Sequence, residues 1–187
     1  MIKVVFDACV LYSAPLRGFL LSLATDEMVE PFWSEEIQNE WKRSLIRNRP
    51  DLKWEKLEST CRKMDACFPS GLVRGYEAIT PTLSLPDPKD RHVLAVTIHV
   101  KAEYIVTFNL DDFPQTVLSP YGIKAVSPEE FVLQLIRDDP LHVLKTVQKH
   151  RLSLINPPKT VEEYLATLVK QGLPKTVAFL RRHEKDI

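Results

Sequence analysis

The chain has 187 residues, of which 44% are hydrophobic and 27% charged, and its 25 basic side chains balance 25 acidic ones. This composition is typical of a globular protein that buries a core without disulfides, and it excludes a histone-like polycation. No apolar run reaches the roughly 18–20 residues of a membrane span, and the three cysteines lack the spacing of a zinc ribbon or a disulfide framework. We therefore expect a cytoplasmic protein with reduced, buried thiols and no membrane association.

The N-terminal part of the chain alternates predicted strands and helices. β-branched and aromatic residues predict a strand over 2–6, and apolar spacing of about 3.6 predicts a helix over 15–24. Residues 28–33 fit either a short strand or the end of a helix. Ser34 fits an N-cap, with two acidic residues in the first turn behind it, and the helix that it begins is predicted over 34–48.

The middle of the chain continues this alternation. A helix is predicted over 52–67, followed by an irregular stretch bracketed by prolines. A further helix is predicted from Asp87 to Val100, and then strands over 104–107 and 123–126. Such alternation indicates an α/β fold with a parallel sheet flanked by helices, and ligands of these sheets lie beyond the carboxyl ends of the strands.

The C-terminal part of the chain changes character. Ser127 and Pro128 fit a capping box that begins a helix. From there the pattern is helical, with a second capping box at Thr160 and no further strand. We therefore predict an α/β domain over 1–136 and a helical C-terminal extension over 137–187.

The zero net charge conceals four alternating segments. Residues 1–41 and 64–135 carry more acids than bases, whereas 42–63 and 136–187 carry more bases than acids. A solvated helix face explains either basic run by itself. The combination favours an acidic pocket that binds cations, bordered by basic helices that guide a polyanion such as the backbone of a nucleic acid.

Acidic residues stand at predicted strand ends and helix starts, and a parallel sheet would gather them at one edge. Each also has an ordinary structural interpretation, as an N-cap, a solvated helix side chain, a capping box or a turn. Together they suit Mg²⁺ or Mn²⁺, which prefer oxygen ligands and activate water beside a phosphate. The candidates are Asp7, Glu40, Asp87, Asp90, Asp111 and Asp112.

Other patterns in the sequence are less informative. Glu36 and Glu40 share a predicted helix face, which costs a few tenths of a kcal/mol unless a positive group lies nearby. His92 and His99 share another helix face, but two histidines without a third ligand favour surface or partly buried side chains over a zinc site. The five glycines form no nucleotide-binding motif, so no organic cofactor is expected.

Three segments combine these acids with characteristic neighbours. They are Val4-Val5-Phe6-Asp7, Asp87-Pro88-Lys89-Asp90-Arg91-His92-Val93-Leu94-Ala95 and Ile105-Val106-Thr107-Phe108-Asn109-Leu110-Asp111-Asp112-Phe113. With Glu40 between the first two, their order and spacing resemble the PIN-domain ribonucleases of the VapC type, the toxin half of bacterial toxin–antitoxin pairs. The resemblance covers about residues 2–135. It implies a PIN-like fold and a metal-dependent endoribonuclease that hydrolyses RNA phosphodiester bonds.

The resemblance also implies a set of catalytic metal ligands. Asp7, Glu40 and Asp90 would hold Mg²⁺ or Mn²⁺, and Asp112 would be a fourth, more variable acid. Asp111 could fill the same fourth place. The family further implies an RNA substrate, an inhibitory antitoxin protein and, as a common property, a homodimer.

The resemblance assigns supporting roles as well. Thr107 and Asn109 would support the site by hydrogen bonds, and Asp87 would cap the neighbouring helix. The family usually has Thr-Asn after its first Asp, whereas this chain has Ala8 and Cys9, so an amide donor is missing. A non-catalytic PIN-like module that binds RNA or protein is therefore the alternative. A flap-type DNA nuclease is less favoured, because no helical arch or helix-hairpin-helix motif is evident.

Overall fold

The computed structural model describes all 187 residues, which form two compact units. Unit 1 comprises 1–12 and 29–126, and unit 2 comprises 13–28 and 127–187. Because unit 2 takes a segment from near the N-terminus, the chain passes between the units more than once. The predicted domain boundary at residue 136 stays a prediction.

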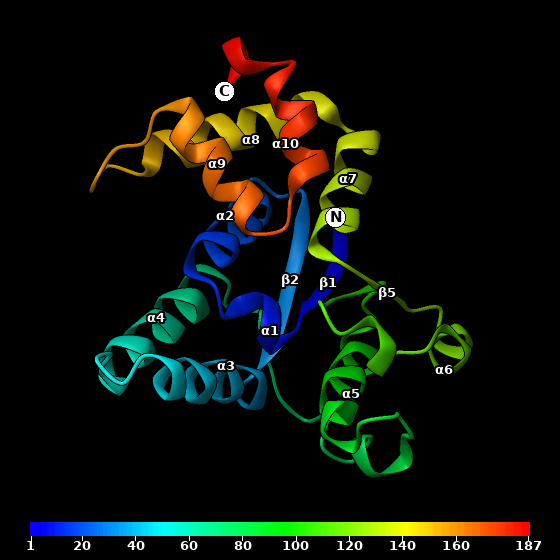
Figure 1. Ribbon diagram of the computed structural model, residues 1–187. Coiled ribbons are helices and arrows are strands. Elements are labelled where there is room, and N and C mark those ends of the chain that lie inside the picture. The colour runs from blue at the N-terminus through cyan, green and yellow to red at the C-terminus, as the bar shows by residue number, and fades with distance from the viewer. The chain divides into compact units, whose positions relative to one another are not determined.

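Unit 1 contains a five-stranded sheet in the order β3-β2-β1-β4-β5. Figure 1 labels β1, β2 and β5 of this sheet. Every neighbouring pair of strands is parallel, which confirms the predicted α/β fold with a parallel sheet. The strand β1 lies at the centre, and its three last side chains have no exposed surface. The strands are β1 (Ile2–Phe6), β2 (Val29–Ser34), β3 (Leu72–Val73), β4 (Tyr104–Val106) and β5 (Lys124–Val126).

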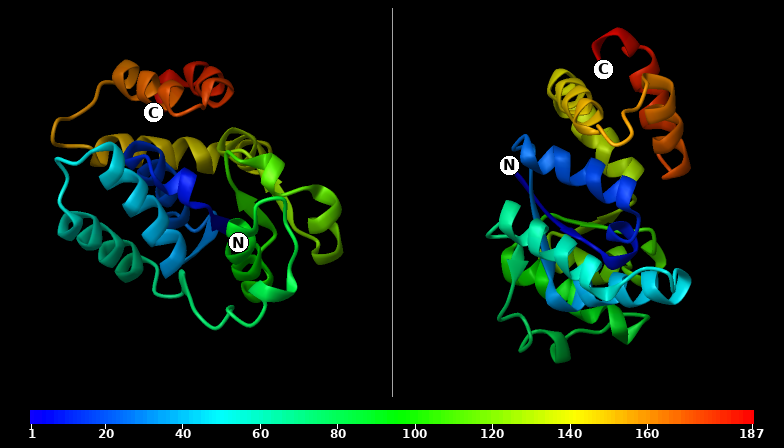
Figure 2. Two further views of the ribbon diagram at one scale, coloured as in Figure 1. Left: turned by 60° about the horizontal axis from the view of Figure 1, so that its bottom comes forward. Right: turned by 90° about the vertical axis from the view of Figure 1, so that its left-hand side faces the viewer.

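Helices flank this sheet. The helix α5 contacts both β1 and β2, whereas α1 contacts α3. The helices α3 and α4 lie side by side (Figure 2), where Lys42 is paired with Glu58 and lies over the ring of Trp54. The helices of unit 1 are α1 (Ala8–Leu11), α3 (Glu35–Asn48), α4 (Trp54–Cys67), α5 (Arg91–Val100) and α6 (Gln115–Leu118).

Local chemistry explains where α3 begins. Residues 28–33, which fitted two interpretations, belong largely to the strand β2. The hydroxyl of Ser34 then accepts a hydrogen bond from the backbone of Ile37, so Ser34 is the N-cap that the sequence predicts. This cap begins the helix directly after the strand and places Glu40 on the second turn of α3.

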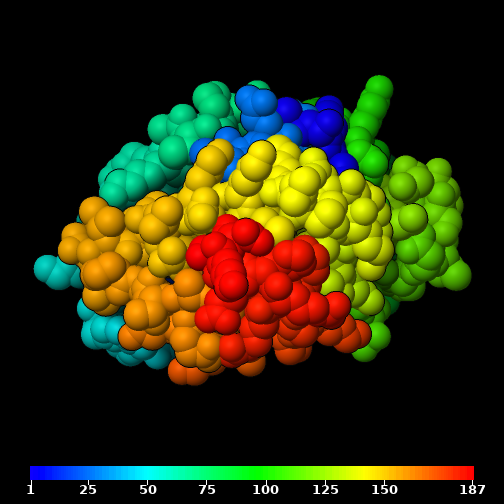
Figure 3. All heavy atoms as spheres, turned by 90° about the horizontal axis from the view of Figure 1, so that it is seen from above, coloured from blue at the N-terminus to red at the C-terminus, as the bar shows by residue number.

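Unit 2 is entirely helical apart from one isolated bridge between Ile155 and Pro158. Capping boxes at Ser127 and Thr160 begin α7 and α9, as predicted. In the view of Figure 3, the yellow α8 segment and the red C-terminal segment lie side by side on one face of this unit. Its helices are α2 (Ala14–Thr25), α7 (Pro128–Asp138), α8 (Pro140–Ser153), α9 (Val161–Lys170) and α10 (Pro174–Arg181).

The inclusion of α2 in unit 2 was not expected from the sequence. Its side chains Leu16, Phe19, Leu20 and Leu23 are buried, and α2 contacts α8 and α9. None of the helices combines the length and the apolar character that crossing a membrane requires.

Candidate functional site

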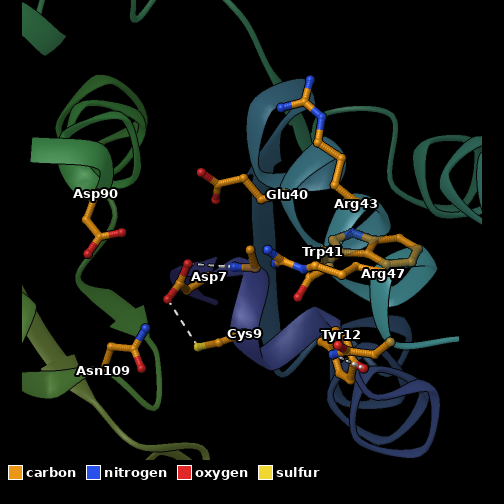
Figure 4. A pocket seen from close by; sticks show the side chains of 12 residues that line it. Asp7, Cys9, Tyr12, Glu40, Trp41, Arg43, Arg47, Asp90 and Asn109 are labelled. Carbon is orange, nitrogen blue, oxygen red and sulfur yellow. Dashed lines mark hydrogen bonds between the residues drawn. The ribbon is translucent and has the colours of Figure 1, made fainter. Parts of the chain in front are cut away.

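A pocket of unit 1 brings three of the predicted acids together. Asp7 follows β1, Glu40 lies on α3, and Asp90 immediately precedes α5, yet all three line one cavity of about 810 Å³. Figure 4 shows their carboxylates directed toward the same space. The pocket therefore lies beyond the carboxyl ends of the central strands, where parallel sheets place their ligands.

The position of Asp7 follows from the sheet register. Phe6 of β1 pairs with Val106 of β4, so Asp7 and Thr107 are the next residues on two neighbouring strands. The hydroxyl of Thr107 donates a hydrogen bond of 2.7 Å to Oδ2 of Asp7, while the backbone N–H of Ala8 donates one of 2.6 Å to Oδ1. Asp7 is thus both the N-cap of α1 and a pocket residue, with only 4% of its surface exposed.

Cys9 provides a hydrogen-bond donor at the position where the family usually has the amide of an Asn. Its Sγ lies 3.1 Å from Oδ2 of Asp7, and the backbone N–H of Phe108 donates to the same sulfur at 3.3 Å. Burial, followed by the negative charge of Asp7, raises the pKa of Cys9 to about 12. The thiol therefore stays protonated at neutral pH and can donate its S–H to Asp7.

Asp90 has the most perturbed carboxyl group of the site. Burial raises its pKa to about 7, with further contributions from the charges of Asp7, Asp112, Asp87 and Glu40. Its side chain caps no helix and accepts no hydrogen bond from the protein. The alternative interpretation of Asp90 as part of a capping box is therefore wrong, because a 3₁₀ turn over Pro88–Asp90 precedes α5 and leaves the carboxylate free.

Glu40 contacts a histidine that the sequence placed at the surface or only partly buried. His92 is 3% exposed, and its Nε2 lies 3.1 Å from Oε1 of Glu40. Its Nδ1 lies 3.8 Å from the carboxylate of Glu36. Burial opposes a charge on this ring, but the hydrogen bond and the charge of Glu40, then Glu36, outweigh burial and raise the pKa of His92. His99, by contrast, is exposed.

The remaining predicted residues surround these acids. Asn109 lines the pocket, and its backbone N–H donates to the buried Thr107 hydroxyl at 3.0 Å. Asp87 accepts a hydrogen bond from the backbone of Lys89 and caps the 3₁₀ turn. Neither Asp111 nor Asp112 lines the pocket, but only Asp112 is among the charges that act on Asp90.

Two arginines of α3 line the same pocket and were not singled out by sequence reasoning. Arg43 and Arg47 are exposed, and neither guanidinium has a hydrogen bond or an ion pair within the protein. They lie three and seven residues after Glu40, so α3 presents one acid and two cations on a shared face. The signal for them was the basic run over 42–63, read at helical spacing from Glu40.

The residues present fit a hard divalent cation bound largely through water. No three His, Cys, Asp or Glu side chains lie close enough together to ligate one ion directly. Mg²⁺ usually keeps several waters and uses only one or two carboxylates, which this looser arrangement matches. The Asp90 carboxylate, half-buried and without a protein donor, is the group that a cation would stabilise most.

An acid-lined pocket at the carboxyl edge of this parallel sheet defines the molecule as a PIN-type protein, and comparisons agree. The PIN domain family matches residues 3–111, and the VapC50 C-terminal domain family matches 128–182. The chain is 33% identical over 138 residues to "Putative ribonuclease VapC50" of Mycobacterium tuberculosis (strain ATCC 25618 / H37Rv), covering 69% of this chain and 78% of that protein. The chain belongs to the PIN-domain family, as a VapC-type member. No solved structure matches it.

Proposed function

We propose that the chain is a Mg²⁺- or Mn²⁺-dependent endoribonuclease, the toxin of a VapBC-type toxin–antitoxin pair. The observation that carries this proposal is the pocket in which Asp7, Glu40 and Asp90 converge from three segments of unit 1. The name of its mycobacterial relative, a ribonuclease, supports the same activity.

The side chains in the pocket and next to it have two roles in this proposal. Asp7, Glu40 and Asp90 would hold the cation, with Asp112 adding negative charge beside Asp90. The bound cation would activate water and polarise the scissile phosphate. Thr107 and Cys9 keep Asp7 in place, and the family resemblance implies products with a 3′-hydroxyl and a 5′-phosphate.

The basic side of the pocket suits the other part of the substrate. Arg43 and Arg47 have no internal partner, so their guanidinium groups are available to phosphates next to the cleaved one. A pocket that combines clustered carboxylates with unpaired cations matches a phosphodiester substrate better than a neutral ligand.

Cleavage of RNA by the purified chain tests the proposal. We expect cleavage with Mg²⁺ or Mn²⁺ and none in excess EDTA. Asp7→Asn and Asp90→Asn should each lower the cleavage rate at least about a hundred-fold, because each loses a cation-binding charge. Asparagine is a good N-cap, so Asp7→Asn keeps the start of α1. Asp111→Asn is the matched control, since Asp111 is exposed and lies outside the pocket lining.

Equal cleavage by the wild type, Asp7→Asn and Asp90→Asn would exclude this activity. The alternative, a non-catalytic PIN-like module, predicts RNA or protein binding without any Mn²⁺ binding that depends on Asp7. The contact between Cys9 and Asp7 weakens its motivation, since the thiol supplies a donor where the family usually has an amide.

The partners follow from family membership. We propose that a VapB-type antitoxin inhibits the chain, that the chain acts in the cytoplasm, and that it forms a homodimer. Co-purification with the product of a short neighbouring open reading frame, followed by loss of RNA cleavage in the complex, tests the first point. Size-exclusion chromatography with light scattering tests the last.

A further inference from the structure

His92 is a buried side chain of the site to which none of the roles above has been given. It lies in the first turn of α5, two residues after Asp90, and only 3% of its surface is exposed. Its Nε2 lies 3.1 Å from Oε1 of Glu40 on α3. A carboxylate only accepts, so the Nε2 proton must lie between the two groups.

The other edge of the ring faces a second acid. Nδ1 of His92 lies 3.8 Å from Oε2 of Glu36 and has no hydrogen-bond partner, although the atom is buried. Glu36 and Glu40 are one helical turn apart, and their like charges would repel. The imidazole therefore lies between the two carboxylates, and its hydrogen bond restrains the side chain of Glu40.

The helix α5 makes this contact rigid. Its apolar side chains Val93, Leu94 and Val96 have no exposed surface, and the helix contacts the central strands β1 and β2. Asp90 immediately precedes this helix, and the first turn of the helix contacts Glu40 of α3 through His92. Asp90 and His92 are only two positions apart in the chain. The backbone between them therefore restricts the distance between the carboxylates of Asp90 and Glu40.

We propose that His92 is a positioning residue, which holds Glu40 at a fixed separation from Asp90 so that both can share one divalent cation. Glu40 uses one oxygen for His92, and its other oxygen has no protein donor. A glutamate side chain loses rotational freedom when it binds an ion, and prior restraint lowers that cost. Partners that hydrogen-bond metal-binding side chains change metal affinity about 10- to 100-fold when they are lost.

This inference rests on the proposed function, and Mn²⁺ binding by the protein without RNA tests it separately. We expect His92→Leu to weaken Mn²⁺ binding about ten-fold or more, measured by calorimetry. His92→Gln should stay within about three-fold of the wild type, because its amide nitrogen reaches the place of Nε2. His99→Leu and His99→Gln are the matched controls on the exposed part of the same helix and should change nothing.

Two further measurements separate positioning from a general structural role. In a Glu40→Ala background, His92→Leu should cause no additional loss of Mn²⁺ affinity, because the carboxylate that His92 contacts is already gone. In RNA cleavage, His92→Leu should lower kcat at limiting Mn²⁺ and recover at saturating Mn²⁺, with KM for RNA unchanged. If His92→Leu does not fold, His92→Asn replaces it, since its shorter amide cannot reach Glu40.

The outcomes distinguish this inference from the proposed function. Wild-type affinity for Mn²⁺ in His92→Leu, or an equal loss with and without Glu40, would overturn the positioning role while leaving the nuclease proposal intact. A wild-type protein that neither binds Mn²⁺ nor cleaves RNA would overturn the proposed function first.

Discussion

At the scale of single residues, Asp7 is the N-cap of α1 and also lines the acidic pocket. Its Oδ1 accepts the capping hydrogen bond of α1, whereas Oδ2 accepts from Thr107 and contacts Cys9. The sequence predicted both roles as alternatives, because the position after a strand suits an N-cap as well as a ligand. The structure confirms the cap and places the same side chain in the pocket, whereas the ligand role stays a prediction.

His92 shows the limit of sequence reasoning at the same scale. The like-charged pair Glu36 and Glu40 was a usable signal, since it calls for a positive or donating group nearby. Which residue supplies that group depends on how α5 contacts the sheet, and 52 residues separate His92 from Glu40 in the chain. The helical spacing of His92 and His99 suggested a shared environment, but the structure buries one and exposes the other.

The cysteines differ in predicted reactivity, which corrects the expectation that all three thiols are buried. Cys67 is exposed, whereas Cys61 is buried and Cys9 has a pKa raised to about 12 by burial and by Asp7. Because the thiolate is the reactive form, we expect iodoacetamide at pH 8 to modify Cys67 at least about a hundred-fold faster than Cys9. Peptide mass spectrometry over a time course measures both rates.

The control for this experiment is the unfolded chain. In about 8 M urea, where the chain is unfolded, all three cysteines should react at similar rates because burial is lost. Rapid alkylation of Cys9 in the folded protein would contradict the contact between its thiol and Asp7.

At the scale of elements, capping residues made the starts of three helices predictable. Ser34, Ser127 and Thr160 begin α3, α7 and α9 where the sequence places them, because each side chain satisfies a free backbone N–H of the first turn. Elements with little periodicity were missed. The strand β3 has only two residues, and α1 only four, so neither contains a full repeat of its pattern.

The pocket-facing side of α3 leads to a prediction about substrate binding. Arg43→Ala and Arg47→Ala should each raise KM for RNA about ten-fold, with little change in kcat, because a charge-assisted phosphate contact contributes about 1.5 kcal/mol or more. Each substitution should also weaken the salt dependence of RNA binding. Steady-state cleavage and fluorescence anisotropy at several salt concentrations measure these effects.

Arg62→Ala is the control for the two arginines. Arg62 is an exposed arginine of α4 that does not line the pocket, so its removal changes net charge without removing a pocket contact. If all three substitutions raise KM equally, the effect comes from long-range electrostatic attraction of RNA by the whole protein and not from direct contacts of α3.

At the scale of the whole molecule, unit 2 contains a partly buried titratable group, His150. His150 of α8 contacts the rings of Phe19 and Tyr164, and its Nδ1 lies 2.9 Å from the Tyr164 hydroxyl. Gly18 lies beside the ring, where a Cβ would be in ordinary van der Waals contact with Nε2 of His150 at 3.4 Å. Burial lowers the pKa of His150 to about 4.

The lowered pKa of His150 predicts acid sensitivity. Because the unfolded chain binds this proton with an ordinary pKa of about 6.5, stability is complete above that pH and falls as the pH approaches 4. We expect the wild type to lose about 2–3 kcal/mol more than His150→Asn between pH 7 and 4.5. Urea unfolding followed by circular dichroism measures this difference. Tryptophan fluorescence is less suitable, because all three tryptophans lie in unit 1 whereas His150 lies in unit 2.

Asparagine is a suitable replacement because its amide ends near the position of Nδ1 and does not titrate. His99→Asn controls for removal of an exposed histidine and should keep the wild-type loss. An identical acid response in His150→Asn and the wild type would contradict a lowered pKa of His150 in the folded chain.

The assignment of α2 to unit 2 also affects how the chain is made. Residues 13–28 leave the ribosome early, whereas the helices that cover Leu16, Phe19, Leu20 and Leu23 are among the last to be translated. A nascent chain therefore carries an uncovered apolar helix for most of its synthesis, and a gene truncated after residue 126 would leave it uncovered permanently. Such a fragment is expected to require a chaperone or to aggregate, even though every residue of the acidic pocket is still encoded.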